Sequence, residues 1–296
     1  MIKLAIVIPY YKIDFFEKTL KSISKQSDKR FTLYIGNDAS PNNPLEIIEK
    51  YFSEGQYNYY DYKENYGGQN LAKQWERILE NVTEDWFQIL GDDDMIAENF
   101  VEEFYNCIED VEDKKLNLIR FPAKYINDDK QIKKVSLQYD SVAKVKDLFE
   151  DKVFFRNQVT LSENVFRNQA FRKIGFTHYP LAWYSDLKIV LDITGFNDYY
   201  FNNRSFVTIY NGEHNISNGS FKKKIKFEAS QIFLVEIING FNDKISYVVY
   251  NRFLDLLFME ARKEKYSLNF KIILSFLRKF KIKLGIKSFV KYIKLK

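Results

Sequence analysis

Three consecutive aspartates, Asp92, Asp93 and Asp94, follow an apolar run and a glycine in the stretch "ILGDDDMI". Adjacent carboxylates raise one another's pKa, so an empty cluster of this kind is electrostatically unfavourable. A divalent cation removes that penalty, and carboxylate oxygens suit hard cations such as Mg²⁺, Mn²⁺ or Ca²⁺. The D-x-D-x-D-G spacing of an EF-hand loop is absent. The triplet indicates a cation site with positions left for phosphate oxygens, and a solvated turn is the alternative.

The first 120 residues alternate short apolar runs with stretches of helical periodicity. The pattern predicts strands over residues 4–9, 31–38, 57–62 and 85–90, with a helix after each of the first three. Such alternation is typical of a mainly parallel sheet that is covered on both faces. Ligands of open α/β sheets bind beyond the carboxyl ends of the strands. Because "PYYK", "NDAS" and "GDDD" stand at three such ends, we expect them to share one site.

The pattern after residue 120 is less regular. We expect short strands around 117–121 and 131–139, and helical segments at 144–150 and 168–174. The segment 181–195 has helical spacing of apolar residues and ends at a glycine, and everything from Asn218 onward is predicted to be helical.

Composition excludes several classes of protein. With 296 residues, 46% of them hydrophobic, the chain can bury one sizeable core. The single cysteine, Cys107, excludes an internal disulfide framework and a cysteine-rich zinc site. The apolar N-terminal run is too short for a signal peptide, and no apolar stretch reaches about 18 residues. We therefore expect a cytoplasmic protein, or one peripheral at the inner face of the cell membrane.

Charge is distributed unevenly along the chain. The net charge is +5, but residues 262–296 contain 12 Lys and Arg against one acid, Glu264, so this tail carries +11. Its lysines alternate with Phe, Ile and Leu, a basic amphipathic pattern that suits an anionic lipid surface. The alternative is a terminal helix that packs on the domain with its lysines in water. No nucleic-acid fold signature is present, so a nucleic-acid partner is not expected.

Several motifs together resemble the family 2 inverting glycosyltransferases of the GT-A fold. The stretches "IVIPYYK", "YIGNDASPN", "ENYGGQNLAKQW" and "ILGDDDM" follow one another in that family's order. Further on, "NVFRNQAFRKIGFTHYPLAWYSDLKI" resembles its acceptor-side region, and "GEHNIS" a histidine-bearing stretch near the end of its catalytic domain. The resemblance implies an α/β, Rossmann-like mixed sheet flanked by helices. It implies a catalytic domain at 1–217, with a nucleotide-sugar-binding half at 1–115 and an acceptor-side half at 116–217, before a C-terminal helical region at 218–296.

The resemblance also implies roles on the donor side. Asp38 matches the acid that approaches the base of the nucleotide sugar, and Pro9 and Tyr10 lie where the chain passes the nucleoside. Asn70 and Lys73 open the helix that approaches the donor.

The acidic triplet matches the family's metal-binding DXD region, with Gly91 where the first aspartate is usual. The resemblance then implies that Asp93 is the principal ligand of Mn²⁺ or Mg²⁺, that Asp94 supports it, and that Asp92 contacts the ribose or a metal-bound water. His214 is implied to contact the metal or the diphosphate. The glycine leaves open which two of the three acids bind the metal.

The predicted base is Asp186. Many family members have Glu-Asp where this chain has Ser185-Asp186, so Asp186 is the acid that remains. It stands at the predicted start of a helix and is suited to cap that helix as well. Asp192 is the competing acid but lies deeper in the helix, and His178 is an additional candidate on the acceptor side.

The implied reaction is metal-dependent, inverting transfer of a hexosyl-type sugar. The expected donor is a nucleoside-diphosphate sugar, with uracil as the base, and the acceptor is a saccharide or lipid-linked saccharide of surface polysaccharide assembly. The "QxxRW" stretch and spanning helices of processive members are absent, so one sugar per encounter is expected. A sugar nucleotidyltransferase would need a glycine-rich basic phosphate loop, which "PYYKIDFFEK" lacks. A nucleotide-sugar-binding protein without activity is the other alternative, against which Asp186 argues.

Overall fold

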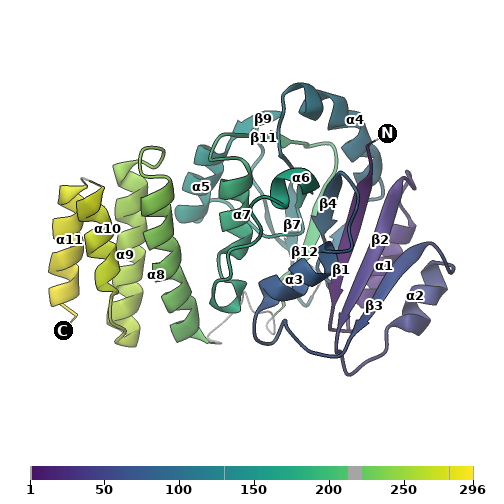
Figure 1. Cartoon of the computed structure of the whole chain (residues 1–296), viewed down its shortest axis with the longest axis horizontal. Helices are drawn as coiled ribbons and strands as arrows, with labels where there is room; N and C mark the ends of the chain where they lie inside the picture. Colours follow the sequence, from purple (N-terminus) through teal and green to yellow (C-terminus); the bar gives the residue numbers. More distant parts are fainter. Residues whose placement is uncertain (1, 130, 213–221, 280, 296) are drawn as a thin grey trace.

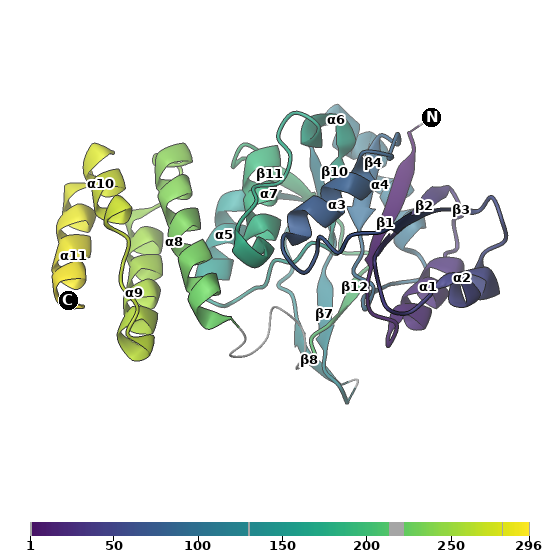
Figure 2. The same cartoon turned by 60° about the horizontal axis from the view of Figure 1, so that its bottom comes forward.

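The computed structural model of the chain describes residues 2–129, 131–212, 222–279 and 281–295. An α/β part occupies one side of the molecule, and a row of helices occupies the other (Figure 1). Strands β2 (Phe31–Asp38) and β3 (Tyr57–Tyr62) lie at one end of the molecule and the last helix, α11 (Ile282–Ile293), lies at the other, in both Figure 1 and Figure 2.

The central sheet has eight strands in the order β3-β2-β1-β4-β10-β6-β11-β9. Their bounds are β1 Leu4–Tyr10, β2 Phe31–Asp38, β3 Tyr57–Tyr62, β4 Trp86–Ile89, β6 Leu118–Arg120, β9 Val142–Lys144, β10 Asn164–Arg167 and β11 Asp198–Phe201. The first four are parallel, and β10 runs antiparallel to both β4 and β6. The predicted mixed α/β fold is confirmed, and the four predicted N-terminal strands have nearly the expected bounds.

A smaller sheet continues from the acidic triplet. Its four strands are β5 Met95–Ile96, β12 Val207–Tyr210, β7 Ala123–Ile126 and β8 Ile132–Val135, in that spatial order. β12 pairs with β5 directly after the aspartates. The second half of the chain therefore returns to the acids through a strand too short to give a clear sequence signal.

Helices cover both faces of the central sheet. They are α1 Phe16–Ser24, α2 Leu45–Tyr51, α3 Leu71–Leu79, α4 Phe100–Asp113, α5 Val145–Val153, α6 Asn168–Phe171 and α7 Ser185–Ile193, with a 3₁₀ turn at Pro180–Ala182. Successive side chains of a strand point to opposite faces. Accordingly Ile6 packs with α1 and α4 in one core, while Ala5 and Val7 pack with α3 and α7 in the other.

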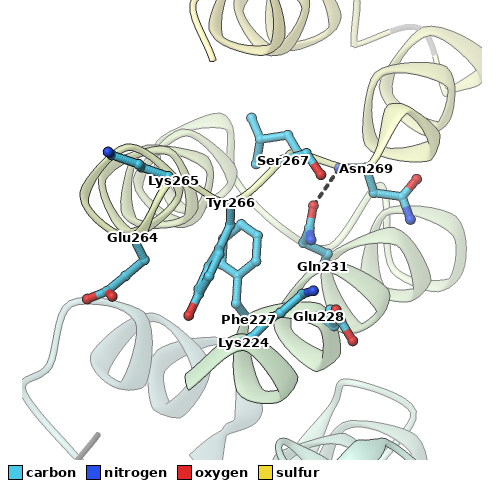
Figure 3. Close-up of a pocket in the computed structure, with 10 residues that line it drawn as sticks. Lys224, Phe227, Glu228, Gln231, Glu264, Lys265, Tyr266, Ser267 and Asn269 are labelled. Carbon is cyan, nitrogen blue, oxygen red and sulfur yellow. Dashed lines mark hydrogen bonds between the residues drawn. The ribbon is translucent and has the colours of Figure 1, made fainter. Parts of the chain in front are cut away.

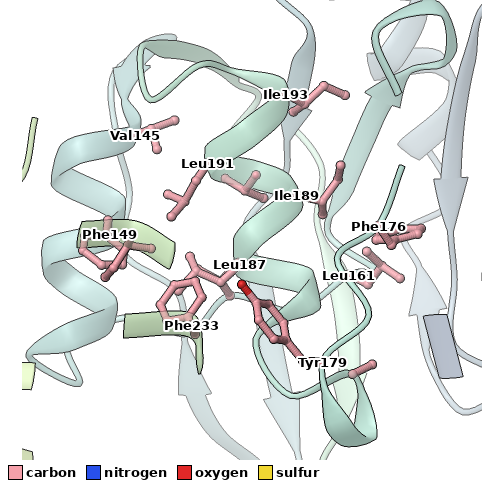
Figure 4. Close-up of a cluster of buried hydrophobic side chains, with 14 of the residues drawn as sticks. Val145, Phe149, Leu161, Phe176, Tyr179, Leu187, Ile189, Leu191, Ile193 and Phe233 are labelled. Carbon is pink, nitrogen blue, oxygen red and sulfur yellow. The ribbon is translucent and has the colours of Figure 1, made fainter. Parts of the chain in front are cut away.

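Four helices follow the α/β part: α8 Lys223–Gly240, α9 Tyr247–Glu264, α10 Phe270–Arg278 and α11 Ile282–Ile293. The prediction of a C-terminal helical region is confirmed. Phe233 of α8 is fully buried beside Phe149 and Leu187, so this region shares the core of α5 and α7 (Figure 4). Its ring stacks on that of Tyr184, with centroids 4.5 Å apart. Among the described helices, none is long and apolar enough to cross a membrane.

Candidate active site

The polar segments after β1, β2 and β4 converge, as predicted. Strand order reverses at β1, which has β2 on one side and β4 on the other, the place where open α/β sheets bind ligands. The hydroxyl of Ser40, after β2, donates a 2.6 Å hydrogen bond to the carbonyl of Tyr11, after β1. The N–H groups of Tyr11 and Lys12 each donate a 2.7 Å bond to the carboxylate of Asp92. One chain of hydrogen bonds therefore joins the three strand ends.

Asp92 is a half-buried acid that bonds to the chain after β1 and has a raised pKa. Its burial, reinforced by the charge of Asp93, raises its pKa to about 7. The two backbone N–H groups from the end of β1 oppose this rise but do not cancel it. Its carboxylate therefore fixes the chain after β1, and contact with a ribose or a metal-bound water stays a prediction.

Asp94 points into the protein. It is 6% exposed, and its two carboxylate oxygens accept bonds from the Ser162 hydroxyl, at 2.5 Å, and from the N–H of Tyr210, at 2.9 Å. Burial and the charge of Asp93 hold its pKa well above the ordinary range. Asp94 thus ties the turn after β4 to β12, and its proposed support of a metal stays a prediction.

Gly91 has a steric explanation. A Cβ at this position would lie 2.9 Å from an oxygen of Asp94 and 3.1 Å from an oxygen of Asp93. The turn closes tightly on its own acids, so an aspartate at position 91 would have to displace them. The departure from the DXD pattern therefore comes with a compact turn in which oxygens of Asp93 and Asp94 both lie next to Gly91.

Asp93 is half-buried between the two acids whose pKa values its charge raises. The carboxylate oxygens of Asp93 suit a hard divalent cation that takes its remaining ligands from phosphate oxygens and water. Among the described residues, no three His, Cys, Asp or Glu side chains are grouped to hold a metal. A cation here would therefore rely on its nucleotide ligand. His214 lies outside the described residues.

Asp38 holds a loop. Its carboxylate is buried at the end of β2 and accepts bonds from the N–H groups of Tyr66, at 2.8 Å, and Gly67, at 2.7 Å. It also pairs with the guanidinium of Arg77, which stacks 3.8 Å from the centre of the Tyr62 ring. The predicted contact of Asp38 with a donor base is untested by this geometry, which shows Asp38 positioning the segment 63–70.

The other predicted donor-side residues lie near this loop and near the end of β1. Tyr10 is fully buried, and its hydroxyl donates a 3.0 Å bond to the carbonyl of Asn42. The Tyr10 phenol is therefore engaged inside the protein, and contact of Pro9 and Tyr10 with a nucleoside stays a prediction. Asn70 caps α3 by accepting a 3.3 Å bond from the N–H of Lys73, whose ammonium is exposed.

His178 joins the donor-side loop to the segment before α7. Its Nδ1 lies 3.0 Å from the amide nitrogen of Asn70, and its Nε2 lies 2.8 Å from a carboxylate oxygen of Glu76. The second oxygen of Glu76 accepts a 2.9 Å bond from the N–H of Phe176. The imidazole is thus oriented from both sides by α3.

Asp186 lies in the first turn of α7, as predicted. It accepts a 2.7 Å bond from the N–H of Leu187, and burial raises its pKa to about 6, partly offset by Lys152. A carboxylate with this pKa is matched to accept a proton near neutral pH. Asp192, the competing acid, is held 2.5 Å from the ammonium of Lys188.

The backbone before Asp186 is unusual. Leu181, Ala182 and Tyr184 all adopt positive φ angles, a region that residues other than glycine rarely occupy. The Ser185 hydroxyl anchors this turn through a 2.7 Å bond to the carbonyl of Thr177. Such strained backbone clusters at functional sites, where the surrounding packing enforces it.

The sequence profile of the family described as "Glycosyl transferase family 2" matches residues 5–173. The chain belongs to glycosyl transferase family 2. Its fold is similar to that of S. aureus TarS 1-349, at a TM-score of 0.65 and 15% identity, covering 99% of this chain and 89% of that one. The same TarS fragment in complex with UDP-GlcNAc gives 0.67 and 16%, and in complex with UDP 0.67 and 15%. No curated protein sequence matches the chain. At these identities the structural likeness shows the shared fold.

Behind the acids of this family 2 chain lies a buried ion pair that sequence reasoning missed. Arg120 and Glu163 are both fully buried, 2.7 Å apart, and Arg120 also donates to Asn164 at 3.0 Å. The charge of Glu163 adds to the rise in pKa of Asp94 and of Asp186. The one available signal was a charged residue at the end of each of the apolar runs "LNLIR" and "VTLSE".

Tyr125 of β7 connects the donor-side and acceptor-side acids. Its side chain is buried, and within the described structure its hydroxyl has no hydrogen-bond partner. Burial raises its pKa, and Glu163, Asp94 and Asp186 all add to that rise. Asp94 and Asp186 therefore both lie close enough to Tyr125 for their charges to act on its hydroxyl.

Two cavities lie elsewhere in this glycosyltransferase-family chain. One, of about 580 Å³, lies between α8 and the link from α9 to α10, where the N–H of Asn269 donates to Gln231 (Figure 3). The other, of about 330 Å³, is lined by residues of the segment 139–147. Neither is lined by Asp93 or Asp186.

Proposed function

We propose that the protein is a metal-dependent, inverting, non-processive glycosyltransferase. The donor would be a nucleoside-diphosphate sugar, with UDP as the first candidate because the structurally similar TarS fragment has been crystallised with UDP and with UDP-GlcNAc. The observation that carries the proposal is that Asp186, whose pKa burial raises to about 6, and Asp94, which follows β4 at the strand switch point, both act on the pKa of Tyr125.

In the proposed reaction the acceptor oxygen forms a bond to the anomeric carbon while the bond from that carbon to the diphosphate oxygen breaks. The electron pair leaves with the diphosphate. Asp186 accepts the hydroxyl proton, which makes the oxygen a better nucleophile. Attack from the face opposite the leaving group inverts the anomeric centre, and a single base suffices for this.

Asp93 is the residue that would hold Mn²⁺ or Mg²⁺, with Asp92 and Asp94 fixing the turn around it. When bound, the ion would neutralise the charge that develops on the leaving diphosphate. Asp92 and Asp94 act through the backbone: one holds the end of β1 and the other holds β12. Both sides of the turn are then fixed relative to Asp93.

The acceptor we propose is a saccharide or lipid-linked saccharide of a surface polysaccharide, approached from the side of α7. Support comes from the orientation of the loop before α7, which His178 ties to the donor side. A cytoplasmic enzyme at the inner face of the membrane would meet both substrates, and no nucleic acid takes part.

The decisive experiment incubates the chain with a panel of nucleoside-diphosphate sugars and saccharide acceptors, with Mn²⁺ or with EDTA. We expect one donor class to give a product of inverted anomeric configuration by NMR, and only with the metal. Release of a nucleoside monophosphate instead of a diphosphate would point to a different reaction. Nucleotide binding without turnover across the panel would favour a binding protein.

A further inference from the structure

The two last helices, α10 and α11, form a helical hairpin with two apolar sides. The inner side is buried: Ile272, Ile273 and Phe276 of α10 and Leu284 of α11 have almost no exposure. Gly285 lets the helices approach closely, since a Cβ there would lie 2.7 Å from Leu277. The packed-helix reading of the tail is therefore correct for this inner side.

The outer side of the hairpin is apolar too, and it is exposed. The exposed apolar side chains are Phe270, Leu274 and Leu277 on α10 and Ile282, Ile286, Phe289, Val290 and Ile293 on α11. Their spacing of three and four residues gathers them on one face of each helix. The hairpin lies at the outer edge of the molecule in both views (Figures 1 and 2). An apolar face of this extent marks an interaction surface.

The charges around this face are of one sign. No acid occurs between residues 265 and 296. Exposed Arg278 follows Leu274 by four residues and exposed Lys294 follows Val290 by four, so the cations border the apolar face. The ammonium groups of Lys287 and Lys291 both donate hydrogen bonds to Asp255 of α9, on the side of the hairpin that packs on the protein. Among the described residues of the hairpin, Lys271, Arg278, Lys283 and Lys294 are exposed and can meet an external anion.

We propose that the outer face of α10 and α11 docks on an anionic phospholipid surface. Apolar side chains bordered by cations fit the boundary between headgroups and acyl chains, with lysine and arginine at the headgroup phosphates. A second copy of the chain is a poorer partner, because it would bring the same positive charge against the face. This surface is separate from the acids of the candidate active site, so the proposal does not depend on the transferase assignment.

Flotation of the full chain with lipid vesicles tests the proposal. We expect co-flotation with phosphatidylcholine vesicles that contain phosphatidylglycerol, weakened by high salt, and little with phosphatidylcholine alone. The paired change Ile286→Ser and Phe289→Ser removes two side chains that are 57% and 46% exposed, and should lower the bound fraction roughly tenfold or more. Lys283→Glu with Lys294→Glu should do the same on anionic vesicles.

Matched controls keep the test specific. Ile132→Ser removes an apolar side chain of β8 that is 57% exposed, and Lys146→Glu reverses an exposed charge on α5; both should float like the wild type. Thermal unfolding should show that all variants are folded. Absence of wild-type flotation, or equal flotation of the hairpin variants, overturns the proposal. A wild-type dimer that Ile286→Ser with Phe289→Ser dissociates in sedimentation overturns it too, in favour of self-association.

Discussion

The acids on the two sides of the site are held in opposite ways. On the donor side, Asp38, Asp92 and Asp94 each accept hydrogen bonds from segments far away in the sequence. On the acceptor side, Asp186 accepts its bond from Leu187, the next residue. A carboxylate tied to distant backbone groups fixes geometry, whereas one at the start of a helix keeps its protonation free to change. The difference supports the proposal that the first group positions the site and that Asp186 transfers the proton.

The largest effect should come from Asp186→Asn. The amide keeps the size of the side chain and can still accept the bond from Leu187, but it cannot take a proton. Loss of a general base typically costs about 10²- to 10⁴-fold in rate, and we expect a drop of that size in kcat. Wild-type kcat should also fall as pH drops below about 6, where the carboxyl becomes protonated.

Asp192→Asn is the matched control on the same helix, because Asp192 is already paired with Lys188. It should leave kcat nearly unchanged, and neither variant should change the affinity for UDP. A fully active Asp186→Asn enzyme would remove the distinction between the two groups of acids.

The next effect concerns Asp93, the donor-side acid that we assign to the cation. Asp93→Asn should weaken Mn²⁺-dependent binding of UDP by at least about tenfold, as expected when a metal site loses affinity. Titration calorimetry with and without EDTA measures this directly. If wild-type binding proved indifferent to EDTA and to Asp93→Asn alike, the donor side would have no metal role.

The positioning role of Asp38 is tested through its loop. A Cβ at Gly67 would lie 2.6 Å from the Asp38 carboxylate, so Gly67→Ala should push the loop away. Overpacking of this kind costs about 1–3 kcal/mol in the free energy of unfolding, and the affinity for UDP should fall with it. Gly240→Ala is the control, because a Cβ there meets nothing within 4 Å. Equal unfolding midpoints for the two variants would contradict the loop-holding role.

Without a bound metal, the ionised carboxylate of Asp92 should lower the free energy of unfolding. Its folded pKa of about 7 lies above its ordinary value, so the folded state binds the proton more tightly than the unfolded chain does. Its contribution therefore favours folding at low pH and is lost as pH rises through about 7. Near pH 8 without metal, Asp92→Asn should raise the free energy of unfolding by up to about 4 kcal/mol, because the penalty for ionising the buried carboxyl is removed while the amide oxygen can still accept from Tyr11 and Lys12. Denaturant titrations at a series of pH values between about 3 and 8 measure the difference, which should shrink as pH falls from about 7 and vanish below about pH 4, where the carboxyl is protonated in both states.

The sequence predicted the donor side better than the acceptor side, for a physical reason. Long buried strands such as β1 and β2 leave continuous apolar runs, and the polar residues at their ends are visible without a structure. The acceptor side is built from strands of three or four residues. A strand is expected around 117–121, where β6 lies, but β7 and β10 are too short for their periodicity to be detected. Arg120, Glu163 and Tyr125 lie on or beside these strands, and only the fold brings them to Asp94 and Asp186.

The smallest effect should come from His178, the residue that bridges the two sides. Through Asn70 and Glu76 it fixes the segment before α7 to the donor-side helix α3. Loss of a residue that couples two parts of a site typically changes substrate affinity by about two- to tenfold. We therefore expect His178→Ala to raise the acceptor KM by that factor. His178→Gln, which can restore one of the two bonds, should recover part of the loss. A change in kcat with an unchanged acceptor KM would instead place the imidazole in the chemistry, and the acceptor side would then contain a second proton-transfer group beside Asp186.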